Sequence, residues 1–190
     1  MLLRAAQYPV NRWKNGGGVT REIAASPAGA GMEDFDWRIS MATVAQDGPF
    51  STFPGIDWTL FLLDGDGMVL RFESTDEVFL AAGDMHGPFA ADIPTDARLT
   101  GGEITDLNIM TRRGRVSHRA RYRRIEGSAH ITPQQCTLAV FGVDGALKVA
   151  QGDDLLDLYP RDCLILKQGM ADAKLQGTGT VIQAEFAGLT

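Results

Sequence analysis

Residues 59–70 read TLFLLDGDGMVL, and residues 137–148 read TLAVFGVDGALK. The two segments align without a gap when the chain is shifted by 78 residues (137 − 59 = 78), and the match extends to Asp84 and Asp162. Both segments contain an apolar, strand-like run, then an Asp-Gly pair, then a second apolar run. An Asp-Gly pair readily adopts the positive φ of a tight turn, so we expect a hairpin at this point of each copy. The repeat predicts two copies of one β unit.

The rest of the chain favours an all-β fold. Its 190 residues are 44% hydrophobic, which suffices for a substantial core. Short runs rich in Val, Ile, Leu and Phe recur between Gly, Asp, Asn and Pro, as in a sandwich or barrel, and long helical periodicity is scarce. With the junction of the repeat near residues 128–135, we predict an N-terminal domain of residues 1–127 and a C-terminal domain of residues 128–190. Strands from the N-terminal segment are available to complete the second domain.

This pattern resembles the cupin fold, a small antiparallel barrel. The resemblance implies an all-β bicupin, with two RmlC-like β-barrels or jelly rolls related by the repeat. Of the four positions that carry metal ligands in cupins, one in the first copy holds His86 and the others hold Pro54, Ile56 and Leu60. In the second copy none of the four is a His or a carboxylate. A divalent metal needs three or four converging donors, so we predict a protein without a metal or other cofactor.

The most distinctive string is WKNGGGVTREIA, residues 13–24. Three consecutive glycines after Asn15 predict a sharp turn whose backbone a ligand can approach closely. The residues that follow alternate like a strand, with Thr20 and Glu22 on one face. A flexible turn into an edge strand would give the same pattern. A phosphate-binding loop is disfavoured, because Gly-Lys-Ser/Thr is absent and no helical pattern follows.

The same string resembles the opening signature of the HutD/Ves family, W-[KR]-N-G-G-G-x-T-x-E-I. The similarity continues through FDWRISMA (35–42), GPFSTFPG (48–55), LLDG (62–65) and DLNIMTR (106–112). The family resemblance implies a bicupin, in agreement with the repeat. It also implies an association with bacterial histidine utilisation, in which such a protein acts as a regulatory binder of a small pathway metabolite and not as a pathway enzyme.

Polar residues on otherwise apolar strands mark the candidate site. Arg38 and Ser40 share one face of their strand, and Asn108 and Arg112 share one face of theirs. The interior of a small barrel is normally apolar, and a buried Arg must be paired, for which Glu22 is the obvious partner. A structural ion pair that closes the barrel mouth would explain these residues. An Arg fork with amide and hydroxyl donors would equally suit a bound carboxylate.

His86 completes the candidate set as a donor or pH-sensitive group, although a packed histidine is the simpler alternative. We predict no catalytic residue and no metal ligand. The predicted ligand-binding residues are Asn15, Thr20, Glu22, Arg38, Ser40, His86, Asn108, Met110 and Arg112.

Charge and hydropathy restrict the partners. The net charge is −6, which argues against nucleic acid, although residues 112–124 contain seven arginines and no acid and are expected to form a strand with a solvated basic face. No apolar run is long enough for a membrane span, and residues 1–13 do not resemble a signal peptide, so we expect a cytoplasmic protein without a membrane partner. A homodimer remains open.

Three hypotheses follow for function. The first is a metal-free binder of a small polar or anionic metabolite, for which the family resemblance suggests urocanate, formylglutamate or formate. The second is a metal-independent isomerase or hydrolase with Glu22 or His86 as general acid or base. The third is an interaction module that uses the basic strand. Binding is favoured over catalysis because a neighbouring Arg38 would depress the pKa of Glu22 and make it a poor base at neutral pH.

Overall fold

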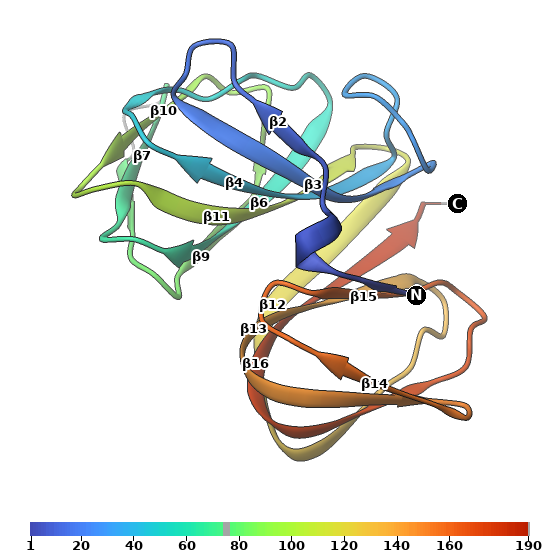
Figure 1. Cartoon of the computed structure of the whole chain (residues 1–190). Helices are drawn as coiled ribbons and strands as arrows, with labels where there is room; N and C mark the ends of the chain where they lie inside the picture. The colour runs from blue at the N-terminus through green and yellow to red at the C-terminus, as the bar shows by residue number, and fades with distance from the viewer. Residues whose placement is uncertain (74–76, 190) are drawn as a thin grey trace. The chain divides into compact units, whose positions relative to one another are not determined.

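Figure 1 shows the computed structural model, which describes residues 1–73 and 77–189. Residues 74–76, which fall inside the repeated segment 59–84, and residue 190 lie outside the described part. Within it every regular element is a strand except the 3-10 turn η1 (Ala5–Gln7), so the predicted all-β class is confirmed. No helix in the described ranges is long and apolar enough to cross a membrane.

The chain forms two compact units, Pro9–Val116 and Met1–Tyr8 with Ser117–Thr190. The predicted boundary between residues 127 and 128 lies inside strand β12 (Val116–Ile131), and the N-terminal strand β1 (Leu2–Leu3) pairs within the second unit.

The unit of residues 9–116 contains two antiparallel sheets. One has the strand order β2-β3-β4-β11-β6-β9, and the other has the order β5-β10-β7-β8. The strands of the larger sheet are β2 (Val10–Arg12), β3 (Gly18–Ser26), β4 (Trp37–Val44), β11 (Ile104–Arg112), β6 (Ile56–Asp64) and β9 (Met85–Ala90). The strands of the smaller sheet are β5 (Gly48–Pro49), β10 (Thr95–Leu99), β7 (Met68–Phe72) and β8 (Glu77–Leu80).

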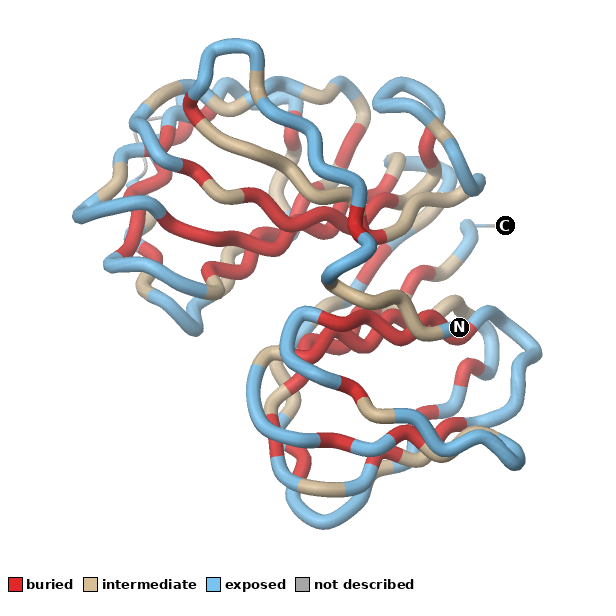
Figure 2. Tube along the Cα trace, in the orientation of Figure 1, coloured by how far each residue is buried: buried red, intermediate tan, exposed pale blue. Residues whose placement is uncertain are grey.

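The core of this unit joins the two sheets. Buried residues of β4 and β6, such as Val44, Leu60 and Leu62, cluster with Met68 and Leu70 of β7. Figure 2 shows the corresponding buried stretches along β4, β6 and β11. Alternation along each strand turns one side chain in two toward this interior.

The other unit contains one antiparallel sheet. Its order is β1-β15-β13-β16-β12, and β14 pairs with β13 beyond this path. Besides β1 and β12, its strands are β13 (Thr137–Gln151), β14 (Asp154–Leu158), β15 (Cys163–Leu166) and β16 (Ala173–Gly188). β13 uses its first half to pair with β15 and its second half to pair with β14. The buried core of this unit includes Val140, Leu147 and Leu175.

The basic segment forms a strand only from Val116 onward. Arg112 ends β11 and residues 113–115 form a turn, whereas residues 116–124 supply the first part of β12, where Arg119 and Arg121 are exposed and His118 is buried. The alternation of exposed and covered side chains therefore agrees with a strand that presents arginines to solvent.

Two expectations about sheet geometry need correction. The three sheets are open paths in the described residues and do not close into barrels. The predicted hairpins at the Asp-Gly pairs are also wrong. Asp66-Gly67 connects β6 to β7, which lie in different sheets, and Asp144-Gly145 lies inside β13 at a register shift against β16. The physical reason is that Gly67 and Gly145 use their positive φ, 131° and 80°, to turn a strand toward new partners.

The turn that ends each repeated segment has the same hydrogen bonds in both units. The Asp84 carboxylate accepts a bond from the Ala81 N–H over 2.9 Å, and the Asp84 N–H donates to the Ala81 carbonyl over 3.0 Å. The Asp162 carboxylate and N–H make the corresponding bonds to Tyr159, over 3.3 and 3.1 Å. The residue before each Asp has a positive φ, 95° at Gly83 and 70° at Arg161.

Candidate functional site

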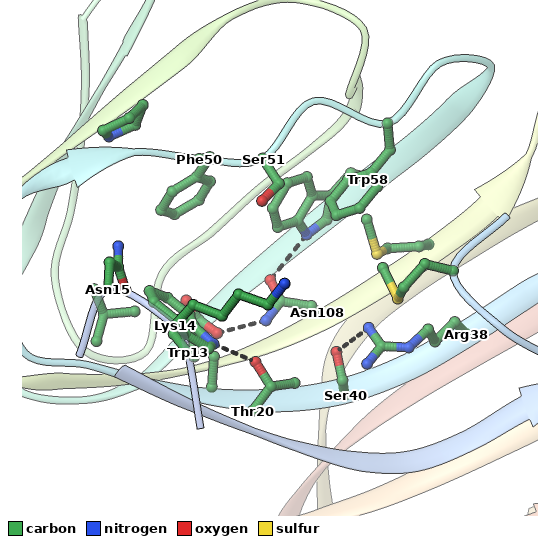
Figure 3. Close-up of a pocket in the computed structure, with 17 residues that line it drawn as sticks. Trp13, Lys14, Asn15, Thr20, Arg38, Ser40, Phe50, Ser51, Trp58 and Asn108 are labelled. Carbon is green, nitrogen blue, oxygen red and sulfur yellow. Dashed lines mark hydrogen bonds between the residues drawn. The ribbon is translucent and has the colours of Figure 1, made fainter. Parts of the chain in front are cut away.

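A cavity of about 530 Å³ opens in the unit of residues 9–116. Figure 3 shows it over β4 and β11, with side chains from the glycine-rich loop on one side and aromatic side chains on the other. Its volume falls in the range of about 300–1,000 Å³ that is usual for small-molecule sites. This cavity therefore coincides with the motifs that the sequence singles out.

Strand register explains why polar residues gather on the floor of this cavity. Residues directly opposite one another in an antiparallel sheet point to the same face. Ser40 of β4 faces Asn108 of β11, and Ala42 faces Asp106. Arg38 faces Met110 in the same ladder. These six residues, which we call the floor, all line the cavity.

The guanidinium of Arg38 is held at one end of the floor. Its Nε donates to Glu22 Oε2 over 2.9 Å, and its Nη1 donates to Ser40 Oγ over 2.9 Å. The predicted pairing of Arg38 with Glu22 is thus confirmed. Arg38 is buried, whereas Glu22 is only partly covered, so solvent reaches the outer partner of the pair. Two of the five N–H donors of the guanidinium are committed, and the positive charge remains at the cavity wall.

A chain of hydrogen bonds crosses the floor. Trp58 Nε1 donates to Asn108 Oδ1 over 2.9 Å, and Asn108 Nδ2 donates to Asp106 Oδ1 over 2.5 Å. Because the indole is only a donor, it fixes the orientation of the amide, and the amide nitrogen must then face the carboxyl. All three side chains are buried.

The carboxyl of Asp106 is electrostatically unusual. Burial raises its pKa to about 7, against the opposing effect of the hydrogen bonds from Asn108 and the Ala42 backbone. No cation of the described chain contributes to this pKa, so the carboxyl has no charge partner of its own. A buried carboxyl that titrates near neutral pH in a cavity can donate a hydrogen bond when protonated, accept one when ionised, or transfer a proton.

The glycine-rich loop forms the rim. Trp13 Nε1 donates to Thr20 Oγ1 over 2.8 Å, and the Asn15 side chain accepts a bond from the Gly17 N–H over 3.0 Å. A Cβ on Gly18 would collide with the Thr43 carbonyl and press on the Trp13 ring, so this position requires glycine. Figure 3 shows the Lys14 side chain reaching from this loop over the floor, on the side of Asn108 and Arg38.

Aromatic rings make up the opposite wall. The Trp58 ring stacks with Phe50 at a centroid distance of 5.3 Å and meets Phe53 edge-on at 5.9 Å. All three line the cavity. The site therefore combines a flat apolar wall with a polar floor and two cationic side chains, Arg38 and Lys14.

The predicted site residues divide into two groups. Those that line the cavity are Asn15, Thr20, Arg38, Ser40, Asn108 and Met110. Glu22 lies behind Arg38. The Arg112 guanidinium donates to the carbonyls of Phe35 and Glu33, over 3.0 and 2.6 Å, and does not line the cavity. His86 packs against the rings of Phe72 and Phe89, and burial lowers its pKa.

Sequence reasoning missed several cavity residues. Asp106 stands two positions before Asn108 on β11, so strand parity alone was enough to include it. Trp58 lies on the apolar strand β6, whose pattern does not distinguish a cavity residue from a core residue. Trp13 and Lys14 belong to a loop, where no periodicity indicates the direction of a side chain.

Metal-binding groups do not converge in this part of the chain. Within residues 1–73 and 77–189, no group of three or more His, Cys, Asp or Glu side chains is placed to hold a metal ion. The polar set of the cavity is an arginine, a lysine, two amides, three hydroxyls and one carboxyl. This set suits hydrogen bonding to an organic anion better than metal coordination.

Comparison with known proteins identifies relatives of the whole chain. The HutD family model matches residues 5–183. A 21.2 kDa protein named for the hutC 3′ region of Pseudomonas putida is 34% identical over 167 residues, which cover 87% of this chain and 86% of the relative. Protein Ves of Citrobacter koseri is 41% identical over 153 residues, covering 79% and 75% of the two chains.

Solved structures agree with this relationship. HutD from Pseudomonas fluorescens, in a structure described as a formate condition, has a TM-score of 0.83 and 30% identity and covers 100% of this chain and 99% of its own. A protein of unknown function from Pseudomonas aeruginosa has a TM-score of 0.89 and 30% identity, with 98% of each chain covered. A cupin 2 barrel-domain protein from Leptotrichia buccalis shows that the fold is cupin-like. Its TM-score is 0.63 at 10% identity, and the match covers 90% of this chain and 89% of that protein. With a family model and relatives spanning most of its length, the chain belongs to the HutD/Ves family.

Proposed function

We propose that the protein binds a small carboxylate or formyl metabolite of histidine utilisation in the cavity of residues 9–116 and acts as a regulatory binder. The observation that carries the proposal is the position of Arg38, a buried cation at the wall of a cavity that also receives Lys14. A carboxylate at this end of the floor would meet a guanidinium held by Ser40 and Glu22. The family and the hut-related names of its relatives support the proposed setting in histidine utilisation.

The rest of the cavity fits such a ligand. The wall of Phe50, Phe53 and Trp58 can cover a flat or apolar portion. A protonated Asp106 can donate to a formyl or carboxyl oxygen, because its pKa of about 7 leaves it largely protonated in mildly acidic solution. Formate, formylglutamate and urocanate are therefore suitable probes.

A metal-independent enzyme is the second candidate, and Asp106 is the observation that favours it. The acid-base groups named from sequence, Glu22 and His86, do not line the cavity. Asp106 does. A carboxyl with a pKa near 7 is matched to general acid or base catalysis at neutral pH. This candidate assigns a proton-transfer role to Asp106 and keeps Arg38 as the anion-binding group.

One experiment separates the two functions. Calorimetry measures the binding of formate, formylglutamate and urocanate to the purified protein, and proton NMR measures whether each probe is converted. Propanoate serves as the unrelated acid. Saturable binding of one probe that then stays chemically unchanged for hours supports the binder. Conversion of a probe that is lost in Asp106→Asn supports the enzyme. Absence of binding by all three probes contradicts the ligand class.

We also propose that the two units are cupin folds derived from one repeated unit. The evidence is the 78-residue alignment and the turn at Asp84 and Asp162, whose hydrogen bonds are the same in both units. The proposal predicts that β6 to β9 superpose on β13 to β15 in an experimental structure. A different strand order in either segment would contradict it.

A further inference from the structure

A second cavity, of about 280 Å³, lies in the unit that contains residues 117–190. Its walls come from the end of β12, the following loop, β13 and β16. The lining residues that matter here are Thr132, Gln134, Leu138, Gln183 and Glu185. At this volume it can hold only a very small molecule.

Strand register gives this cavity the same location in its sheet as the first. Asn108 of β11 lies opposite Leu60, and Asp106 lies opposite Leu62. Shifting the two leucines by 78 residues gives Leu138 and Val140 (60 + 78 and 62 + 78). Glu185 of β16 lies opposite Leu138, and Gln183 lies opposite Val140. An amide and a carboxyl therefore occupy matching positions in the two units, with their order exchanged.

The second pair is also held by a chain of hydrogen bonds. Arg123 Nη1 donates to Gln183 Oε1 over 2.9 Å, and Gln183 Nε2 donates to Glu185 Oε1 over 3.1 Å. Gln183 is only 7% exposed. As in the first cavity, a donor fixes a buried amide, and the amide orients a carboxyl that lines the cavity. Such a prearranged carboxylate is typical of a binding site.

Charge distinguishes the two cavities. The first receives Arg38 and Lys14, whereas the second is lined by no lysine or arginine among the described residues, and His130 is the basic side chain of its lining. The nearby Arg123 donates to the amide oxygen, and no ion pair in the described ranges involves Glu185. The glutamine and threonine side chains around it add carbonyl and hydroxyl acceptors. The set complements a small cation with several N–H donors.

We propose that the cavity at Glu185 and Gln183 is a second binding site, which takes a small planar cation of the guanidinium or imidazolium class. Glu185 accepts the charge-assisted hydrogen bonds, Gln183 positions Glu185, and Gln134 and Thr132 provide further acceptors at the cavity wall. The site is independent of the carboxylate site proposed for residues 9–116.

The test is an NMR titration of the full-length protein with methylguanidinium and with imidazole at pH 6, and acetate is the anionic control. We expect saturable shifts of the backbone amides around Gln134, Gln183 and Glu185 with either cation and none with acetate. Glu185→Gln keeps the shape of the side chain and is expected to weaken the affinity for the cation at least tenfold. Glu126→Gln, an exposed carboxylate of β12 outside the cavity, is the matched control and is expected to bind like wild type.

A second variant guards against loss of folding in Glu185→Gln. Gln134→Glu adds a carboxylate at an exposed position of the cavity wall and is expected to increase the affinity for the cation at least threefold. Absence of saturable cation binding by wild type, or shifts confined to residues 9–116, would overturn the proposal. So would unchanged affinity in a folded Glu185→Gln protein, or in Gln134→Glu if the first variant fails to fold.

Discussion

Arg38 and Glu22 form an ion pair of 2.9 Å in which the two partners differ in burial, since the Arg38 side chain is 8% exposed and the Glu22 side chain is 32% exposed. Arg38 thus carries its charge into the cavity while its counterion lies nearer to solvent. The pair has two consequences, because Glu22 stabilises the buried guanidinium and also competes with any anion that binds it.

Glu22→Gln is therefore expected to change stability and affinity in opposite directions. The free energy of unfolding should fall by about 1–2 kcal/mol, the size of a charge-assisted hydrogen bond that is partly screened by solvent. Affinity for a carboxylate should rise, because Arg38 is no longer neutralised. Urea unfolding and calorimetry measure the two effects. Weaker carboxylate binding in a folded variant would contradict the competition.

Asp106 predicts a pH-dependent stability. Its pKa is about 7 in the folded protein and near 3.8 when unfolded, so the folded state holds the additional proton between about pH 4 and pH 7. The free energy of unfolding contributed by this group therefore falls as pH rises through that window. In Asp106→Asn this decline should disappear, so the free energy of unfolding of the variant should rise relative to that of wild type from pH 5 to pH 8. Parallel curves for the two proteins in urea titrations would refute the assignment.

The same carboxyl affects binding. Arg38 and Lys14 are the basic side chains that line the cavity, and Glu22 pairs with Arg38. Ionisation of Asp106 then adds a negative charge to the cavity. We expect carboxylate affinity to decrease as pH rises through about 7, and to decrease much less in Asp106→Asn. Calorimetric titrations at pH 5.5 and 8 give both values.

Gly18 is expected to tolerate no side chain. A Cβ there would meet the Thr43 carbonyl and the Trp13 ring, so Gly18→Ala should displace Trp13 from Thr20 and lower both stability and ligand affinity. The loss of stability should be about 1–3 kcal/mol, as for other overpacking changes. Gly102→Ala is the matched control, since nothing lies within 4 Å of its Cβ position. Equal melting temperatures of the two variants would count against the proposed close approach.

We predict no stoichiometric transition metal in the purified protein. His86 is the only His or carboxylate at the cupin ligand positions of the sequence, and it packs against Phe72 and Phe89. Elemental analysis should detect well below one Fe, Mn, Ni or Zn per chain. About one metal per chain, lost in His86→Phe, would reverse this prediction.

Strand periodicity explains which parts of the structure the sequence could predict. Arg38 with Ser40, and Asn108 with Met110, reach the cavity because residues two apart on a strand share a face. Arg112 has the same parity, yet it ends β11 and turns to the Phe35 carbonyl. Parity assigns a face, but it does not show where a long side chain finds its hydrogen bonds.

Long-range geometry accounts for the remaining differences. The Asp-Gly pairs predict hairpins, but the pairing partners of β6 and β7 show that the chain changes sheet at the first pair. Likewise, Lys14 reaches the cavity through the shape of a loop. These features depend on contacts between distant residues, which local composition does not encode.

Calorimetric titration of Arg38→Ala tests the central claim most directly. Wild type is expected to bind formate, formylglutamate or urocanate, and Arg38→Ala should weaken that binding by about 1.5–3 kcal/mol, the usual range for hydrogen bonds to a charged group. Arg71→Ala, which removes an exposed arginine on β7, should bind like wild type. Circular dichroism verifies that the variants are folded. If folded Arg38→Ala binds the same acid as tightly as wild type does, the carboxylate site at Arg38 is wrong.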